Sequence, residues 1–160
     1  MIGLLFSVFS LMQFLFSPLW GVSPEGQFIP YLATEVPTVE NGGVSEDGLS
    51  WRVKLRGDAK WHDGQPLTAE DVKYSFDVFF EGRFDAPQQK VYLEGIREAK
   101  IVDPRTVRFT AKQVYFKNFD VVAGLTIIPK HFYGSGDPKD PKFNRQLIGT
   151  GPYTLESWDK

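Results

Sequence analysis

The stretch that decides the fold spans residues 45–72 and reads SEDGLSWRVKLRGDAKWHDGQPLTAEDV. In its first half, apolar residues occupy every second position from 49 to 55, and polar residues lie between them. Because side chains along a strand point alternately to opposite faces, this period of two predicts a strand over residues 49–56. One face should be buried. The other carries Arg52, Lys54 and Arg56, which we interpret as solvated cations and not as an anion-binding row.

The second half of the stretch predicts a tight turn followed by a helix. Asp63-Gly64 is a turn signal, and Thr68 with Asp71 three residues later is typical of a helix N-cap with an acidic first turn. The apolar residues that follow recur at helical spacing, at Val72, Phe76, Phe79 and Phe80. We expect the helix to end near Gly82, since glycine is the usual residue just past a helix.

The remaining segments add short elements of both kinds. Alternating patterns over 99–102 and 106–111 flank a turn at 103–105 and predict a hairpin, whereas residues 84–95 give mixed signals. Further along we expect, in order, a short helix within 115–123, an extended piece turning into helix over 127–133, a polar loop over 134–141 and a last strand from 149 to 158. This order predicts an α+β fold.

Composition excludes several classes of function. The chain has 160 residues and a net charge of −2, from 18 Lys and Arg against 20 Asp and Glu. Binding to nucleic acid rests on concentrated positive charge, so no nucleic-acid partner is expected. The chain has no Cys, which excludes disulfides, thiol nucleophiles and Cys-based metal centres. Aromatic residues reach 15%, an excess that fits either a large core or a ligand pocket.

The first 24 residues carry no charge and allow three interpretations. A signal-like segment would need a positive start and a small-residue cleavage site, and neither is present. A membrane span is long enough, but polar residues and Pro18 interrupt its apolar run. We favour a helix buried on most sides, because small and polar residues recur along it at steps of three and four. A turn over 22–26 and a short extended piece over 27–30 should follow.

No catalytic or metal-binding constellation is visible. His62 and His131 each lie beside a turn, without the spacing of a metal motif, and we interpret both as loop histidines with satisfied ring nitrogens. No serine lies in a nucleophile elbow, and Gly149-x-Gly151 leads into an expected strand instead of a helix. Adjacent carboxylates such as those at 46–47 and 70–71 are typical of caps and turns. The chain is therefore expected to bind and not to catalyse, without a metal or a cofactor.

Residues 45–72 resemble the signature of the family 5 extracellular solute-binding proteins, the oligopeptide- and dipeptide-binding components of ABC importers. Three further pieces resemble the family in the same order, at 29–33 (IPYLA), 102–110 (VDPRTVRFT) and 148–153 (IGTGPY). The resemblance implies an N-terminal fragment of a two-lobed periplasmic-binding-protein fold of type II. It would comprise a first-lobe helix (1–22), a small inserted α+β domain (23–146) and a strand returning to the first lobe (147–160), with the second lobe absent.

The resemblance also implies a function. The expected protein is the substrate-binding subunit of an ABC transporter, which captures peptides or a related small solute outside the cytoplasmic membrane and delivers them to the permease. Its location would be periplasmic or extracellular, with a lipid anchor as one option and the leader outside this chain. A ligand-sensing domain of a regulator with the same ancestry and an unrecognised hydrolase are the alternatives.

Two groups of residues are singled out by the resemblance. By position only, Leu5, Phe6, Ser7 and Tyr92 lie where family members approach the ligand, although a core role is the more common one for Phe6 and Tyr92. The other group marks the family and is expected to serve packing, turns and caps. It consists of Trp61, Asp63, Gly64, Thr68, Asp71, Gly149, Gly151, Pro152 and Tyr153.

Overall fold

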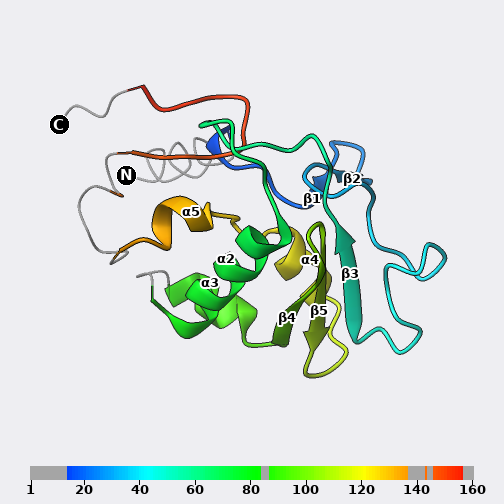
Figure 1. The fold of residues 1–160 in the computed structure, drawn as a ribbon. Coiled ribbons are helices and arrows are strands. Elements are labelled where there is room, and N and C mark those ends of the chain that lie inside the picture. The colour runs from blue at the N-terminus through cyan, green and yellow to red at the C-terminus, as the bar shows by residue number, and fades with distance from the viewer. Residues whose placement is uncertain (1–13, 84–86, 137–142, 144–145, 157–160) are drawn as a thin grey trace, which may run out of the picture.

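The computed structural model describes residues 14–83, 87–136, 143 and 146–156 (Figure 1). In chain order, its elements are β1 (Trp20–Val22), β2 (Phe28–Pro30), β3 (Ser50–Lys54), α2 (Ala69–Glu81), α3 (Pro87–Leu93), β4 (Ile96–Asp103), β5 (Thr106–Ala111), α4 (Asn118–Ala123) and α5 (Lys130–Tyr133). Antiparallel strand pairs are mixed with short helices, which confirms the α+β class.

An antiparallel sheet in the order β3-β5-β4 forms the centre of the molecule. Trp51 lies opposite Phe109 and Val53 opposite Val107, and all four side chains are buried. Phe76 of α2 contacts Phe109 edge-to-face, with ring centres 6.0 Å apart, so α2 packs on this apolar face. The strand and the hairpin predicted from alternating residues are therefore confirmed.

Helix α2 has the predicted limits. It begins directly after Thr68, whose extended backbone marks the N-cap, and it ends before Gly82. Gly82 has a φ of 72°, a left-handed conformation that glycine adopts without strain. The predicted apolar face is buried against the sheet at Val72 and Phe76.

The prediction of a helix over 1–22 is wrong at its end. Residues 1–13 lie outside the described part of the chain, and Trp20–Val22 form strand β1, which pairs with Phe28–Pro30 across the predicted turn. Pro18 lacks a backbone N–H and disfavours helical geometry in the residue before it. The hairpin also gives the backbone N–H and C=O groups at 20–22 hydrogen-bond partners on the neighbouring strand. In a continued helix these groups would have to bond within the helix itself.

Leu19 and Trp20 are fully buried and belong to the same hydrophobic cluster as the central sheet. A second cluster joins Leu15 and Phe16 to Ile128, Tyr133 and Phe143. Residues 15–20 thus pack on the sheet and on α5. The boundaries of the small inserted domain, at 22/23 and at 146/147, stay a prediction.

Two features between residues 84 and 103 differ from the expectation. The region of mixed signals contains helix α3, and β4 begins at Ile96 instead of near residue 99. Register shifts interrupt the β4–β5 ladder on both sides of residues 98–101. Ile101, expected on the buried face with Ala99, is 38% exposed because β4 is the last strand of this sheet and its ladder becomes irregular there.

The expected last strand is not formed over residues 147–156, and residues 157–160 lie outside the described part. The segment instead runs as an irregular strap beside the chain at 14–17 (Figure 1). Its backbone N–H groups at Thr150 and Gly151 both donate to the carbonyl of Leu15, at 3.0 and 2.8 Å. Because two donors share one acceptor, the segment does not form the regular ladder of a strand, and the predicted last strand is therefore absent from residues 147–156.

Candidate functional site

His62 joins the turn at 61–64 to the strap at 148–153. The backbone N–H of Gly149 donates to His62 Nδ1 at 3.1 Å, and His62 Nε2 lies 2.8 Å from the carbonyl oxygen of Gly151. This pattern assigns the neutral tautomer with the proton on Nε2, which donates to Gly151. The backbone N–H of His62 also donates to the carbonyl of Gly149 at 2.9 Å. Both ring nitrogens are therefore satisfied, as predicted.

The glycines of the strap are required by close backbone contact. Gly149 and Gly151 pass directly over the carbonyl groups of Leu15 and Phe14, so that a Cβ atom at either position would collide with backbone. These carbonyls cannot move aside as a flexible side chain would. The G-x-G spacing thus serves packing and not phosphate binding.

A second set of contacts lies beside the glycines. The backbone N–H of Ser17 donates to Thr150 Oγ1 at 3.1 Å, and Phe14 contacts Tyr153 edge-to-face at 5.4 Å between ring centres. A cavity of about 260 Å³ opens here, lined by Ser17 and Thr150 together with residues 31–32, 56 and 58–60. This volume is below the ~300 Å³ at which ligand pockets begin. This cavity is therefore smaller than a typical ligand pocket.

Trp61 and Asp63 connect the turn to α5. Asp63 Oδ2 lies 2.7 Å from His131 Nε2, and the buried Trp61 ring contacts His131 edge-to-face. Burial opposes ionisation of Asp63, but the N–H of Gln65 and the His131 ring outweigh it and lower the pKa of Asp63 below its ordinary value. Gly64, at φ 85°, completes the turn. The predicted turn role of Asp63 and Gly64 agrees with this geometry.

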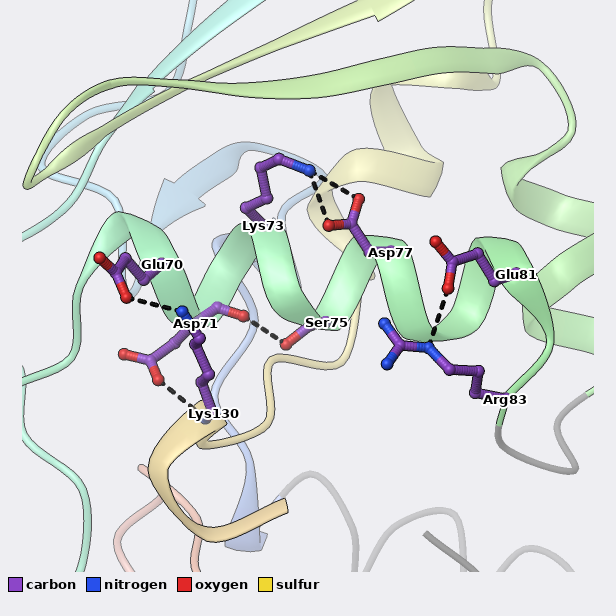
Figure 2. Close-up of polar contacts among 8 residues, drawn as sticks. All are labelled: Glu70, Asp71, Lys73, Ser75, Asp77, Glu81, Arg83 and Lys130. Atoms are coloured by element: carbon purple, nitrogen blue, oxygen red, sulfur yellow. Dashed lines mark hydrogen bonds and ion pairs between the residues drawn. The ribbon is translucent and has the colours of Figure 1, made fainter. Parts of the chain in front are cut away.

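The buried carboxylate of Asp71 binds two separate parts of the chain (Figure 2). Its Oδ2 accepts the backbone N–H of Thr68 at 2.9 Å, and its Oδ1 accepts the backbone N–H of Lys130 at 2.9 Å. The buried Ser75 hydroxyl donates to the carbonyl of Asp71 at 2.7 Å and accepts the N–H of Ile128 at 2.8 Å. The N-terminus of α2 is thereby fixed to α5, and Asp71 forms a capping box with the predicted N-cap residue Thr68.

The residues predicted to lie near a ligand differ in where the structure places them. Leu5, Phe6 and Ser7 lie outside the described residues. Tyr92 lies on α3 and is 66% exposed, so the alternative in which it is a core residue is wrong. Pro152 and Tyr153 are exposed on the strap. The two hydrogen bonds of the His62 ring to Gly149 and Gly151, which we call the clamp, have no signal in the sequence. The two glycines are 87 and 89 residues away from His62.

The geometry does not support the hydrolase alternative. In the described part of the chain, His62 faces backbone groups and His131 faces Asp63, so neither activates a hydroxyl. Within the same residues, His, Asp and Glu form no group of three or more able to hold a metal ion. None of the described helices is both long enough and apolar enough to cross a bilayer.

Comparison with known proteins gives the family. The family model described as "Bacterial extracellular solute-binding proteins, family 5 Middle" matches residues 27–160. The chain belongs to this family. Protein XP55 of Streptomyces lividans is 34% identical over 131 residues, and the match covers 82% of this chain and 23% of that protein.

Two further comparisons agree with this assignment. The probable peptide-binding protein YejA of Agrobacterium fabrum is 31% identical over 137 residues, which is 77% of this chain and 22% of that protein. The crystal structure of NikZ from Campylobacter jejuni in complex with Ni(L-His) superposes with a TM-score of 0.76 at 30% identity, over 93% of this chain and 29% of that one. The chain therefore spans about a quarter of the length of these relatives and has the fold of the corresponding part.

Proposed function

We propose that this family 5 chain is part of the substrate-binding subunit of an ABC importer, which captures a small solute and delivers it to a permease. The observation that carries the proposal is the family match over residues 27–160. The site geometry supports it, because the polar groups at 61–71 and 148–153 hold the chain together and leave no free nucleophile–base pair among the described residues. Such an arrangement suits the capture of a solute and not catalysis.

The proposed place of action is outside the cytoplasmic membrane, in the periplasm or at the cell surface, with a lipid anchor as one means of attachment. The family description, which names extracellular proteins, supports this. The proposed architecture has the first-lobe segments 1–22 and 147–160 flanking the small domain 23–146. A second lobe would close over the solute by a hinge motion.

The proposed solute is a peptide, because YejA is described as peptide-binding. A nickel–histidine chelate is the second candidate, since NikZ holds Ni(L-His). Leu5, Phe6, Ser7 and Tyr92 are the proposed contacts. Tyr92 is exposed on α3, so its ring is available to a solute held between this part and another lobe.

Isothermal titration calorimetry of the full-length protein tests the proposal, with a peptide library and with Ni(L-His) as separate ligands. We expect a peptide to bind, and Tyr92→Ala to weaken binding by about tenfold, the loss typical of one well-packed aromatic contact. Tyr115→Ala is the matched control, because Tyr115 is also an exposed tyrosine but lies in the loop before α4. Binding of Ni(L-His) alone would replace the peptide by the chelate. Binding of neither would overturn the proposed capture of these solutes.

A further inference from the structure

The clamp requires the neutral form of the His62 imidazole. Nδ1 accepts the N–H of Gly149 at 3.1 Å, so this nitrogen carries no proton, while Nε2 donates its proton to the carbonyl of Gly151 at 2.8 Å. A protonated imidazole carries an N–H at both nitrogens. Its second N–H would point at the N–H of Gly149, and two donors do not form a hydrogen bond. Uptake of a proton by His62 therefore breaks one of the two bonds of the clamp.

The group that loses its acceptor is buried. Gly149 lies among the buried residues, so its N–H does not find water in place of the ring, and an unpaired buried N–H is unfavourable. The charge on the ring strengthens the remaining bond to Gly151. An imidazolium released to water, however, finds acceptors for both of its N–H groups, whereas the clamp offers an acceptor to only one. Proton uptake thus favours the released ring.

No carboxylate offsets a positive charge on His62. In the part of the chain that the structure describes, His62 forms no ion pair. Both oxygens of Asp63 are occupied, Oδ1 by the N–H of Gln65 and Oδ2 by His131. Residues 14–17 carry no titratable group. The other charged or titratable groups on the turn and beside the strap are Lys60, Tyr153, Glu156, Lys130 with its partner Glu70, and Arg56 with its partner Asp58.

The other attachments of the strap do not depend on pH. The N–H groups of Thr150 and Gly151 donate to the carbonyl of Leu15, and the N–H of Ser17 donates to Thr150 Oγ1. None of these groups titrates. Among the described residues, every hydrogen bond from the strap to the turn at 61–64 involves His62. Loss of the clamp would therefore separate the strap from the turn and leave it bound to residues 14–17.

We propose that the strap is an acid-sensitive connection, which leaves the turn at 61–64 when His62 takes up a proton and returns when the proton is lost. Histidine side chains in water take up a proton at about pH 6.5, so the release belongs to mildly acidic conditions. The turn lies in the proposed small domain, whereas the strap and residues 14–17 lie in the proposed first-lobe segments. On that division, which rests on the proposed function, acid releases one attachment between the two parts.

Amide hydrogen exchange of the full-length protein tests the proposal, at about pH 7.5 and about pH 5.5, with rates corrected for the intrinsic effect of pH on exchange. The amides of His62 and Gly149 should lose about tenfold in protection, because the lower pH is one unit below the ordinary titration of histidine. The amides of Thr150 and Gly151, which bond to Leu15, should keep their protection. Unchanged protection at Gly149 would overturn the proposal. An equal loss at all four amides would also overturn it, since it would show general loosening.

Two variants assign the response to one histidine. In His62→Gln the side chain keeps a donor and an acceptor but does not titrate, so protection at residue 149 should be the same at both pH values, whatever its level. His131→Gln is the matched control and should keep the acid response, because His131 bonds to Asp63 and not to the strap. The pKa of Asp63 is lowered, so this carboxylate stays charged at about pH 5.5.

An acid response that persists in His62→Gln, or one that disappears in His131→Gln, would assign the effect to another group and overturn the proposal. The wild-type pattern over the four amides decides the question even where a variant fails to fold. No solute is present in these measurements, so their failure would leave the proposed capture of solutes unaffected.

Discussion

His62 and Gly149 contact each other through two hydrogen bonds although 87 residues separate them. The imidazole accepts the N–H of Gly149, and the backbone N–H of His62 donates to the carbonyl of the same glycine. With the further bond to Gly151, this one residue connects the turn after β3 to the strap. The strap in turn lies on the carbonyls at residues 14–15.

Removing the imidazole should destabilise the protein. His62→Ala leaves the N–H of Gly149 and the carbonyl of Gly151 without their partners, and we expect a loss of about 2 kcal/mol in the free energy of unfolding. Urea denaturation of the full-length protein measures it. Lys60→Ala, an exposed residue in the same loop, should change stability by less than about 0.5 kcal/mol. Equal effects of the two variants would contradict the clamp.

The strap glycines should not tolerate a methyl group. Gly149→Ala places a Cβ against the carbonyl of Leu15, and the backbone must shift to accept it, so we expect a loss of at least about 2 kcal/mol. Gly57→Ala is the control, because its Cβ meets only the flexible end of Arg105. Thermal unfolding of both variants measures the loss of stability in each. A Gly149→Ala variant as stable as Gly57→Ala would show that the strap packs differently.

The hydrogen bond between Asp63 and His131 predicts a dependence on pH. The pKa of Asp63 is lowered in the folded protein, so its contribution is present above the unfolded pKa of about 4 and is lost as the pH falls through the lower folded value. Stability measured between about pH 7 and about pH 3 should therefore fall less steeply for Asp63→Asn than for the wild type. Parallel curves for the two proteins would contradict this role of Asp63.

The buried Asp71 should matter more than its exposed neighbour Glu70. Asp71→Ala removes the acceptor of two backbone N–H groups, at Thr68 and Lys130, and we expect a loss of about 2 kcal/mol. Glu70→Ala breaks only an exposed ion pair with Lys130 and should cost less than about 1 kcal/mol. Guanidinium denaturation of the two variants measures their free energies of unfolding. Comparable losses would mean that Asp71 does not fix α5 to α2.

Local patterns were sufficient where an element depends on its own residues. The period of two over 49–55 defined β3, and Thr68, Asp71 and Gly82 defined the limits of α2, because caps and alternating faces act within one or two turns of chain. The family signature followed from the same stretch. Even so, Tyr92 was not placed correctly, because the exposure of a helix of mixed composition depends on what packs against it.

The tertiary structure decided two segments whose conformation the local pattern did not predict. Trp20–Val22 became a strand because Phe28–Pro30 pairs with it beyond Pro18, and the segment at 147–156 became a strap because His62 and the carbonyls at 14–15 bind its backbone. The sequence by itself determined the family, strand β3 and α2. Contacts across some 90 or more residues, which no local periodicity encodes, decided the hydrogen bonds that hold the strap to His62 and Ser17.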